Sequence, residues 1–225
     1  MNGKLVTILQ ISDSAFPTGG FSHSVGLEAA IKLGIVNTTE NFKQFTVQCM
    51  ENAGSFSLPY VTAAYHSCMD QDRLTDLDSR CQACLNNHVA NRASIRQGNS
   101  LIVTAAKIFP DEQIRRIETL LEQDRLHGHY AVMFGFLSAV LQLDLHQAHQ
   151  MFVFGVLRTI IASAVRLGNV GTIEAQRIQF ELQQGVDNII RRNLRRAVEE
   201  ACVTFPLVDI TQNTHDTMFA KLFHS

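Results

Sequence analysis

The stretch ISDSAFPTGGFSHSVGLE, residues 11–28, constrains the fold of this chain more than any other. Pro17 fixes φ and has no N–H, so a helix arriving from Leu5 must stop near Ala15. The glycine pair that follows allows backbone angles closed to other residues, and Ser22 can cap a new helix. The sequence therefore predicts a helix, a tight break and a second, capped helix.

This break also allows chemical interpretations. A glycine-rich turn before a helix can hold phosphate, and Asp13, Ser22 and His23 suggest a nucleophile with its base. The lysine of a Walker A loop is absent, and no strand pattern precedes the turn as a dinucleotide fold would need. A corner between two helices is the plainer interpretation. The catalytic alternative is a metal-dependent or hydrolytic enzyme that uses Ser22, His23 and Glu28.

Composition favours one helical domain. Apolar residues make up 46% of the 225 positions, enough for a sizeable core. No linker rich in Pro, Gly or Ser divides the chain, which favours a single domain over residues 1–225. Few segments alternate as strands do, so we expect an all-α array of about ten helices. A net charge of −2 gives no global attraction for nucleic acid or membranes.

Two strongly apolar segments, 130–141 and 151–165, are expected to be buried core helices. Each is shorter than the ~20 residues that a membrane span needs, and Arg158 interrupts the second. Gly135 and Gly155 lie within these segments, where a missing side chain allows another helix to approach closely.

Capping signals place other helices. An N-cap within residues 37–40 predicts a helix over 39–52, which Gly54 should break before Pro59 starts the next. A long helix is expected over 89–108.

Arginines at 191–196 are expected on a solvated helix face. There, Arg195 and Arg196 would pair with Glu199 and Glu200 four residues on. Because no aromatic residues interleave with them, nucleic-acid binding is disfavoured.

Cys81-x-x-Cys84-x-x-x-His88 is the sharpest local suggestion of a metal site, since these positions share one face of a helix. A structural zinc site needs a fourth ligand, and no second Cys-x-x-Cys exists. Buried thiols are therefore preferred, and no obligatory metal site is expected. The odd count of five cysteines and an N-terminus unlike a signal peptide favour reduced thiols and a cytoplasmic setting.

The C-terminal segment carries large apolar side chains, whereas most chain ends are loose and polar. Met218, Phe219, Leu222 and Phe223 recur at helical spacing and would form one apolar face. This face either packs on its own domain or is held for a partner.

At residues 13–28 the sequence closely resembles the N-terminal signature of the urease accessory protein UreF family. Four further stretches resemble the same family in the same order. They are NRASIRQG at 91–98, HYAVMFG at 129–135, AVRLG at 164–168 with Ala175-Gln176, and PLVDI at 206–210 with LFHS at 222–225. Together these stretches span nearly the whole chain.

The resemblance implies a non-catalytic scaffold, without a cofactor, that acts in nickel insertion into apo-urease. It implies a homodimer that binds a UreD/UreH-type accessory protein and then the nickel-carrying GTPase UreG. By favouring one nucleotide state of the GTPase, such a scaffold would couple GTP turnover to nickel release. Segments 1–20 and 206–225 are the expected docking segments.

Within these stretches we expect the following residues to bind partners: Asp13, Pro17, Gly19, Gly20, Phe21, His23, Glu28, Arg92, Arg96, Gln97, Met218, Phe219, Leu222 and Phe223. An exposed Arg92 or Arg96 would meet carboxylates or phosphates of the GTPase. Internal hydrogen bonds between helices are the equal alternative for these arginines.

Overall fold

The computed structural model describes residues 2–224, which form twelve α-helices and no β-strand. The expected all-α array is confirmed. The α-helices are α1 (Asn2–Ser12), α2 (Leu27–Lys32), α3 (Thr39–Asn52), α4 (Leu58–His66), α5 (Gln71–Cys84), α6 (His88–Ile108), α7 (Glu112–Glu122), α8 (Tyr130–Val140), α9 (Leu145–Arg166), α10 (Thr172–Leu182), α11 (Val186–Asn193) and α12 (Pro206–Asn213).

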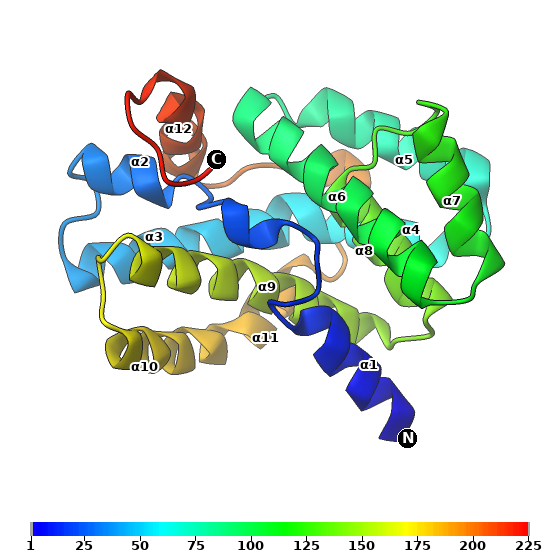
Figure 1. The fold of residues 1–225 in the computed structure, drawn as a ribbon, viewed down its shortest axis with the longest axis horizontal. Helices are drawn as coiled ribbons and strands as arrows, with labels where there is room; N and C mark the ends of the chain where they lie inside the picture. Colours follow the sequence, from blue (N-terminus) through cyan, green and yellow to red (C-terminus); the bar gives the residue numbers. More distant parts are fainter. Residues whose placement is uncertain (1, 225) are drawn as a thin grey trace.

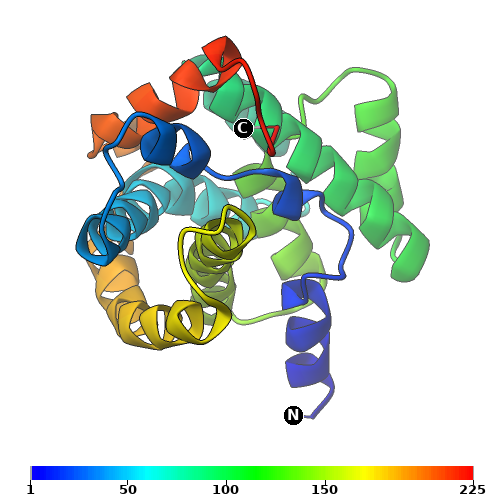
Figure 2. The ribbon, with the colours of Figure 1, turned by 60° about the vertical axis from the view of Figure 1, so that its left-hand side comes forward.

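Two apolar helices organise the core. Helix α8 packs against α4 and α6, while α9 packs against α3, α10 and α11 (Figure 1). Most of α8 is buried, as the apolar segment 130–141 predicts. Helix α1 projects from the body (Figure 2), with Ile11 buried at its inner end and Leu5 and Leu9 exposed.

The helix over 39–52 is confirmed, but the predicted break at Gly54 is wrong. Helix α3 continues through a π-helical turn, η2 (Ala53–Ser57), into α4. Pro59 has no N–H to offer the carbonyl of Ser55, which instead accepts the backbone N–H of Cys202 at 3.2 Å. Because a distant segment satisfies this carbonyl, the helix changes its winding rather than ending.

Helix α9 is longer than the predicted second apolar segment, 151–165. It has 22 residues and is, by length and composition, the one helix among residues 2–224 that could cross a membrane. More than half of its apolar window is buried inside the protein, as in the core helix of a globular domain.

The predicted arginine–glutamate pairs do not form, because α11 ends at Asn193, before either member of each pair. Glu199 instead pairs with Arg80 of α5 at 3.0 Å. Arg196 donates to the backbone carbonyl of Glu200, also at 3.0 Å.

The two glycines of the core helices have different surroundings. At Gly135 a Cβ would collide with the carbonyl oxygen of Val61, so the absent side chain lets α8 lie directly on α4. This confirms the expected close approach at Gly135. At Gly155 a Cβ would meet nothing within 4 Å, so the same expectation is wrong there.

We predict opposite effects of alanine at these two positions. Gly135→Ala must push α8 away from the backbone of α4 and should lower the free energy of unfolding by roughly 2 kcal/mol or more. At Gly155 the added methyl group meets no other atom, and alanine has the higher helix propensity. Gly155→Ala should therefore raise the free energy of unfolding by about 0.5–1 kcal/mol. Urea unfolding of both variants measures this contrast, and equal destabilisation would contradict it.

Candidate functional site

The C-terminal tail, residues 214–224, folds back beside α2 and the glycine-rich break (Figure 1). It begins with a short 3-10 helix, η5 (Thr214–Thr217), and continues without regular structure. The predicted helical face is therefore wrong. Phe223 is buried, Leu222 is half exposed and Phe219 is fully exposed, so these side chains point in different directions.

The carboxylate of Glu28 anchors this tail. Its two oxygens accept the backbone N–H groups of Leu222 at 2.8 Å and Phe223 at 3.1 Å. Lys32, one turn further along α2, pairs with the same carboxylate at 3.0 Å and also donates to the carbonyl of Ala220. Glu28 is only 2% exposed, so it contacts the tail rather than solvent.

This arrangement favours an ionised Glu28. Burial alone would raise its pKa, but the N–H groups of Leu222 and Phe223 and the ammonium of Lys32 outweigh that effect and lower it. His215 lies beneath the tail and donates to the carbonyl of Phe223 at 3.1 Å. Burial, together with the charge of Lys221, lowers the pKa of His215 and keeps its imidazole neutral.

Arg166 joins the tail to the break. Its guanidinium lies over the ring of Phe223, 4.4 Å from the centroid, and 5.1 Å from the ring centroid of Phe21. It also donates to the carbonyl of Phe21. The guanidinium thus makes cation–π contacts with both rings, which holds Phe223 beside the break. Sequence reasoning assigned no role to Arg166, because a sequence alone does not show that Phe21 and Phe223 lie beside it.

Arg92 holds the tail from α6. Both terminal nitrogens of its guanidinium donate to the carboxylate of Asp216, Nη1 at 2.8 Å, and His88 donates to the same carboxylate at 3.0 Å. Hydrogen bonding from Arg92 lowers the pKa of Asp216. Arg92 thus has an internal partner, Asp216 in the 3-10 helix η5 of the tail, as in the alternative of hydrogen bonds between helices. Arg96, one turn on, is exposed and forms no ion pair with any residue of 2–224.

In the break itself, Ser22 does not cap the following helix as predicted. Gly19 has φ +74, a left-handed conformation that glycine adopts easily, and a three-residue 3-10 helix, η1 (Gly20–Ser22), follows it. The Ser22 hydroxyl donates to the carbonyl of Gly19 at 2.7 Å instead of capping α2. The N-cap of α2 is Gly26, and the hydroxyl oxygen of Ser24 accepts the N–H of Glu28 at 3.3 Å.

The contacts of this segment do not assemble a nucleophile with its base. Asp13 is exposed, and its carboxylate accepts the N–H of Ala15 at 2.7 Å, as in a simple turn. The single proton of the Ser22 hydroxyl is engaged with a backbone carbonyl, and the Glu28 carboxylate is engaged with the tail. The carbonyl of Pro17 accepts a hydrogen bond from the hydroxyl of Thr104 in α6, at 3.2 Å. This bond fixes the break against that helix.

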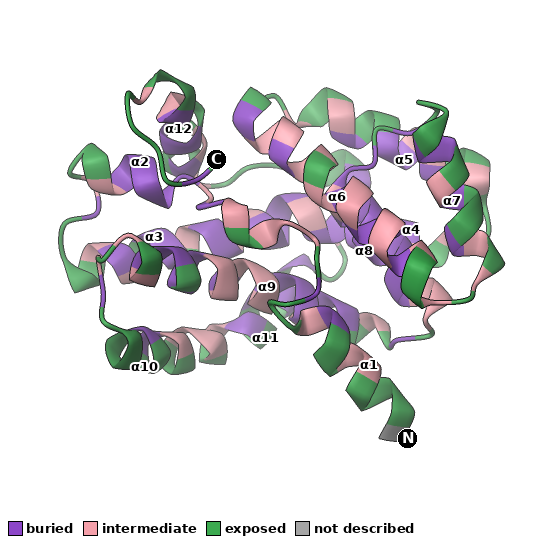
Figure 3. Cartoon of the chain, viewed as in Figure 1, coloured by how far each residue is buried: buried purple, intermediate pink, exposed green. Residues whose placement is uncertain are grey.

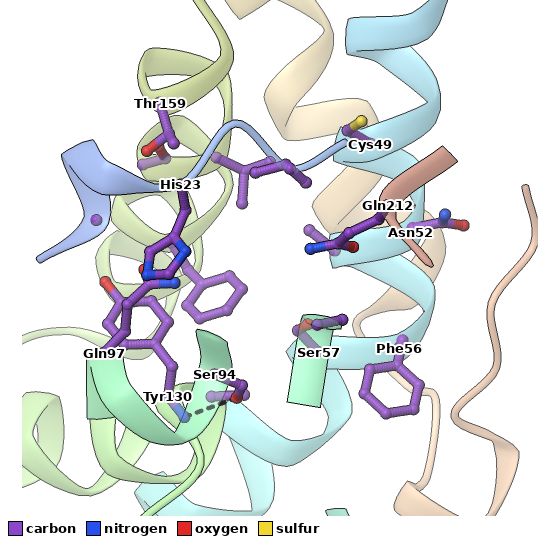
Figure 4. A pocket seen from close by; sticks show the side chains of 18 of the residues that line it. His23, Cys49, Asn52, Phe56, Ser57, Ser94, Gln97, Tyr130, Thr159 and Gln212 are labelled. Atoms are coloured by element: carbon purple, nitrogen blue, oxygen red, sulfur yellow. Dashed lines mark hydrogen bonds between the residues drawn. The ribbon is translucent and has the colours of Figure 1, made fainter. Parts of the chain in front are cut away.

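A cavity of about 220 Å³ lies behind the break, between η1, α3, α6, α9 and α12. Figure 4 shows His23 extending into it toward Gln97 and Tyr130. Burial, reinforced by His224 and Arg96, lowers the pKa of His23 to about 4, so its imidazole is neutral at physiological pH. The polar side chains that line the cavity include His23, Asn52, Ser57, Ser94, Gln97, Thr159 and Gln212.

The cysteine motif does not share one helix face. Helix α5 ends at Cys84, and His88 begins α6, where it binds Asp216. Burial raises the pKa of the Cys81 thiol, which lies within the core, while Cys84 is exposed. Within residues 2–224 no three His, Cys, Asp or Glu side chains form a group that could hold a metal ion.

We predict that removing the carboxylate of Glu28 frees the tail. Glu28→Ala leaves one buried and one partly buried N–H group without acceptors and should cost roughly 2 kcal/mol of stability. Hydrogen exchange measures the effect directly: the amides of residues 222 and 223 should lose protection. Glu174→Ala, which removes an exposed carboxylate from α10, is the control and should leave them protected. Retained protection in Glu28→Ala would contradict the anchor.

A second prediction concerns pH. Folded His23 accepts a proton only near pH 4, whereas an unfolded histidine does so near 6.5. As pH falls below about 6.5, the unfolded state therefore binds more protons and stability decreases, by on the order of 2 kcal/mol at pH 5. His23→Gln should show a smaller loss between pH 7.5 and pH 5 in thermal unfolding. Equal losses in both proteins would refute this assignment.

Comparison with known proteins identifies the family. The UreF family model matches residues 36–183. "Urease accessory protein F" of Oryza sativa subsp. indica is 36% identical over 216 residues, which cover 95% of this chain and 82% of the relative. The protein of the same name from Arabidopsis thaliana is 33% identical, over 96% of this chain and 90% of its own. "Urease accessory protein UreF" of Trichodesmium erythraeum is 28% identical, over 97% and 95%. This chain belongs to the UreF family of urease accessory proteins.

Proposed function

We propose that this chain is the non-catalytic scaffold of a urease maturation complex. It acts as a homodimer in the cytoplasm, binds a UreD/UreH-type accessory protein and recruits the GTPase UreG, so that nickel reaches apo-urease. The family assignment supports an accessory role and contact with other maturation proteins. The named partners, the homodimer, the cytoplasmic setting and the absence of catalysis are parts of the proposal.

The observation that carries this proposal is the apolar surface of the anchored tail. Phe219 is fully exposed and Leu222 is half exposed, although the adjacent Phe223 is buried. Phe21 of the break is also exposed nearby, since Arg166 contacts both Phe21 and Phe223. Burying each such side chain is worth roughly 1.5–3 kcal/mol before ordering costs. Because the tail is already anchored, a partner here binds a preformed surface.

Helix α1 offers a second docking segment. It projects from the body, and its exposed apolar side chains are Leu5, Val6 and Leu9 (Figure 2). An isolated helix of this length is marginal in water, so a partner that covers this face would stabilise it. We assign α1 and the tail to the expected docking segments 1–20 and 206–225.

Arg96 is our candidate contact for the GTPase. It is exposed and free of ion pairs within the described residues, so its guanidinium can meet a carboxylate or phosphate bidentately. Arg92 is less available, because Asp216 binds it. A scaffold that binds one nucleotide state of UreG more tightly than the other shifts the equilibrium between the two states toward the one it prefers. In this way the scaffold would modulate GTP turnover.

The test uses a charge on the exposed tail. Phe219→Glu removes no internal contact and should keep the melting temperature, yet it should weaken binding to the UreD/UreH-type partner at least about 30-fold and reduce urease activation. Met69→Glu, in the exposed turn between α4 and α5, is the matched control. Size exclusion of the mixed purified proteins and a urease activation assay are the measurements. Full binding by Phe219→Glu would exclude the tail as the docking surface.

A further inference from the structure

The cavity behind the break contains a buried amide that the protein leaves without a partner. Gln212 of α12 is only 7% exposed, yet its side-chain amide forms no hydrogen bond with any residue of 2–224. Figure 4 shows this side chain extending from α12 into the cavity. Buried amides are normally hydrogen-bonded, so this one indicates a place for a molecule that the chain itself does not supply.

A second polar group faces the same space from α6. The Nε2 of Gln97 donates to the carbonyl of Ala93 at 3.3 Å, whereas its Oε1 accepts no hydrogen bond from any described residue. That oxygen lies beside Gly20, where a Cβ would be 3.4 Å from it. In Figure 4, Gln97 and His23 lie across the cavity from Gln212. The cavity therefore offers a donor and an acceptor on one side and a further acceptor on the other.

The lining favours an uncharged ligand. Its two charged side chains, Arg158 and Asp209, have opposite signs, and Asp209 already accepts from the amide of Asn87 at 3.2 Å. His23 is neutral at physiological pH, because burial lowers its pKa to about 4. An ion that entered this cavity would lose its hydration without gaining a net counter-charge.

Size and shape favour an aromatic molecule over water alone. The volume of about 220 Å³ equals that of about seven water molecules at ~30 Å³ each. Phe56, Tyr130 and Phe152 contribute rings to the lining, and the rings of Tyr130 and Phe152 stack with their centroids 5.5 Å apart. Water forms poor contacts with such surfaces, whereas a flat ring can stack on them.

We propose that this cavity is a binding site for a small, uncharged aromatic carboxamide. The ligand's amide pairs with that of Gln212 through two hydrogen bonds, each partner donating one N–H to the carbonyl of the other. Its second N–H is available to Oε1 of Gln97, and its ring packs on the aromatic side of the lining.

The position of the site connects it with the tail. A ligand held by Gln212 and Gln97 joins α12 to α6, two residues before the tail begins at Thr214. It can enter from the α9 side, where the lining residues Gly155, Val156 and Thr159 are partly exposed (Figure 3).

The experiment titrates the ¹⁵N-labelled full chain with three probes of one shape and follows the side-chain amide signals of Gln212 and Gln97 by NMR. Benzamide should shift both signals with a Kd of about 1 mM or below. Acetophenone, which lacks the N–H groups, should bind at least about 10-fold more weakly, and benzoate should not shift them. Benzoate binding as tight as that of benzamide would overturn the proposal, because Arg158 would then define an anion site.

A variant tests the amide itself. Gln212→Leu keeps the approximate size of the side chain and removes no internal hydrogen bond, so it should keep the melting temperature while weakening benzamide binding at least about 10-fold. Gln123→Leu, at the exposed end of α7, is the matched control and should bind benzamide as the native chain does. Unchanged binding by Gln212→Leu, or no shift of the native signals by benzamide, overturns the site and leaves the proposed scaffold role standing.

Discussion

The candidate site depends on one buried carboxylate. Glu28 is fixed in the first turn of α2, and its two oxygens receive the only backbone N–H groups that the tail offers there. A buried carboxylate without such donors would be strongly disfavoured, so the tail and α2 stabilise each other. The aromatic contacts of Arg166 and the ion pair of Arg92 with Asp216 then fix the side chains around that anchor.

Buried and exposed side chains alternate within a few residues of the tail. Glu28 and Phe223 are buried and hold the tail together with the exposed Arg166, while Phe219 and the flanking Leu222 face outward. Stretches 13–28, 91–98, 164–168 and 222–225, which suggested the family, converge on this one region. Their spacing along the chain therefore reflects a spatial cluster, and much of the family signature serves to build a surface.

Sequence reasoning succeeded where the signals are local. The helix over 39–52 was predicted from its cap and apolar spacing, and α6 differs from its expected span by one residue at the start. It failed where a distant segment supplies a partner: the Ser55 carbonyl is satisfied by Cys202, and the tail is shaped by Glu28 rather than by its own periodicity. Arg166 and Asp216 were missed for the same reason. The family-like stretch AVRLG was the available signal for Arg166.

The anchoring of the tail by Glu28 also has a consequence for the order in which the fold forms during synthesis. Glu28 and Leu222 are 194 residues apart, so during synthesis α2 emerges long before its hydrogen-bond donors exist. At about 5–20 residues per second, the carboxylate waits roughly ten seconds or more in an incomplete chain. The anchored surface of the tail therefore forms only after residues 222 and 223 have been synthesised. A partner that binds this surface, as proposed above, would select chains that have reached that point.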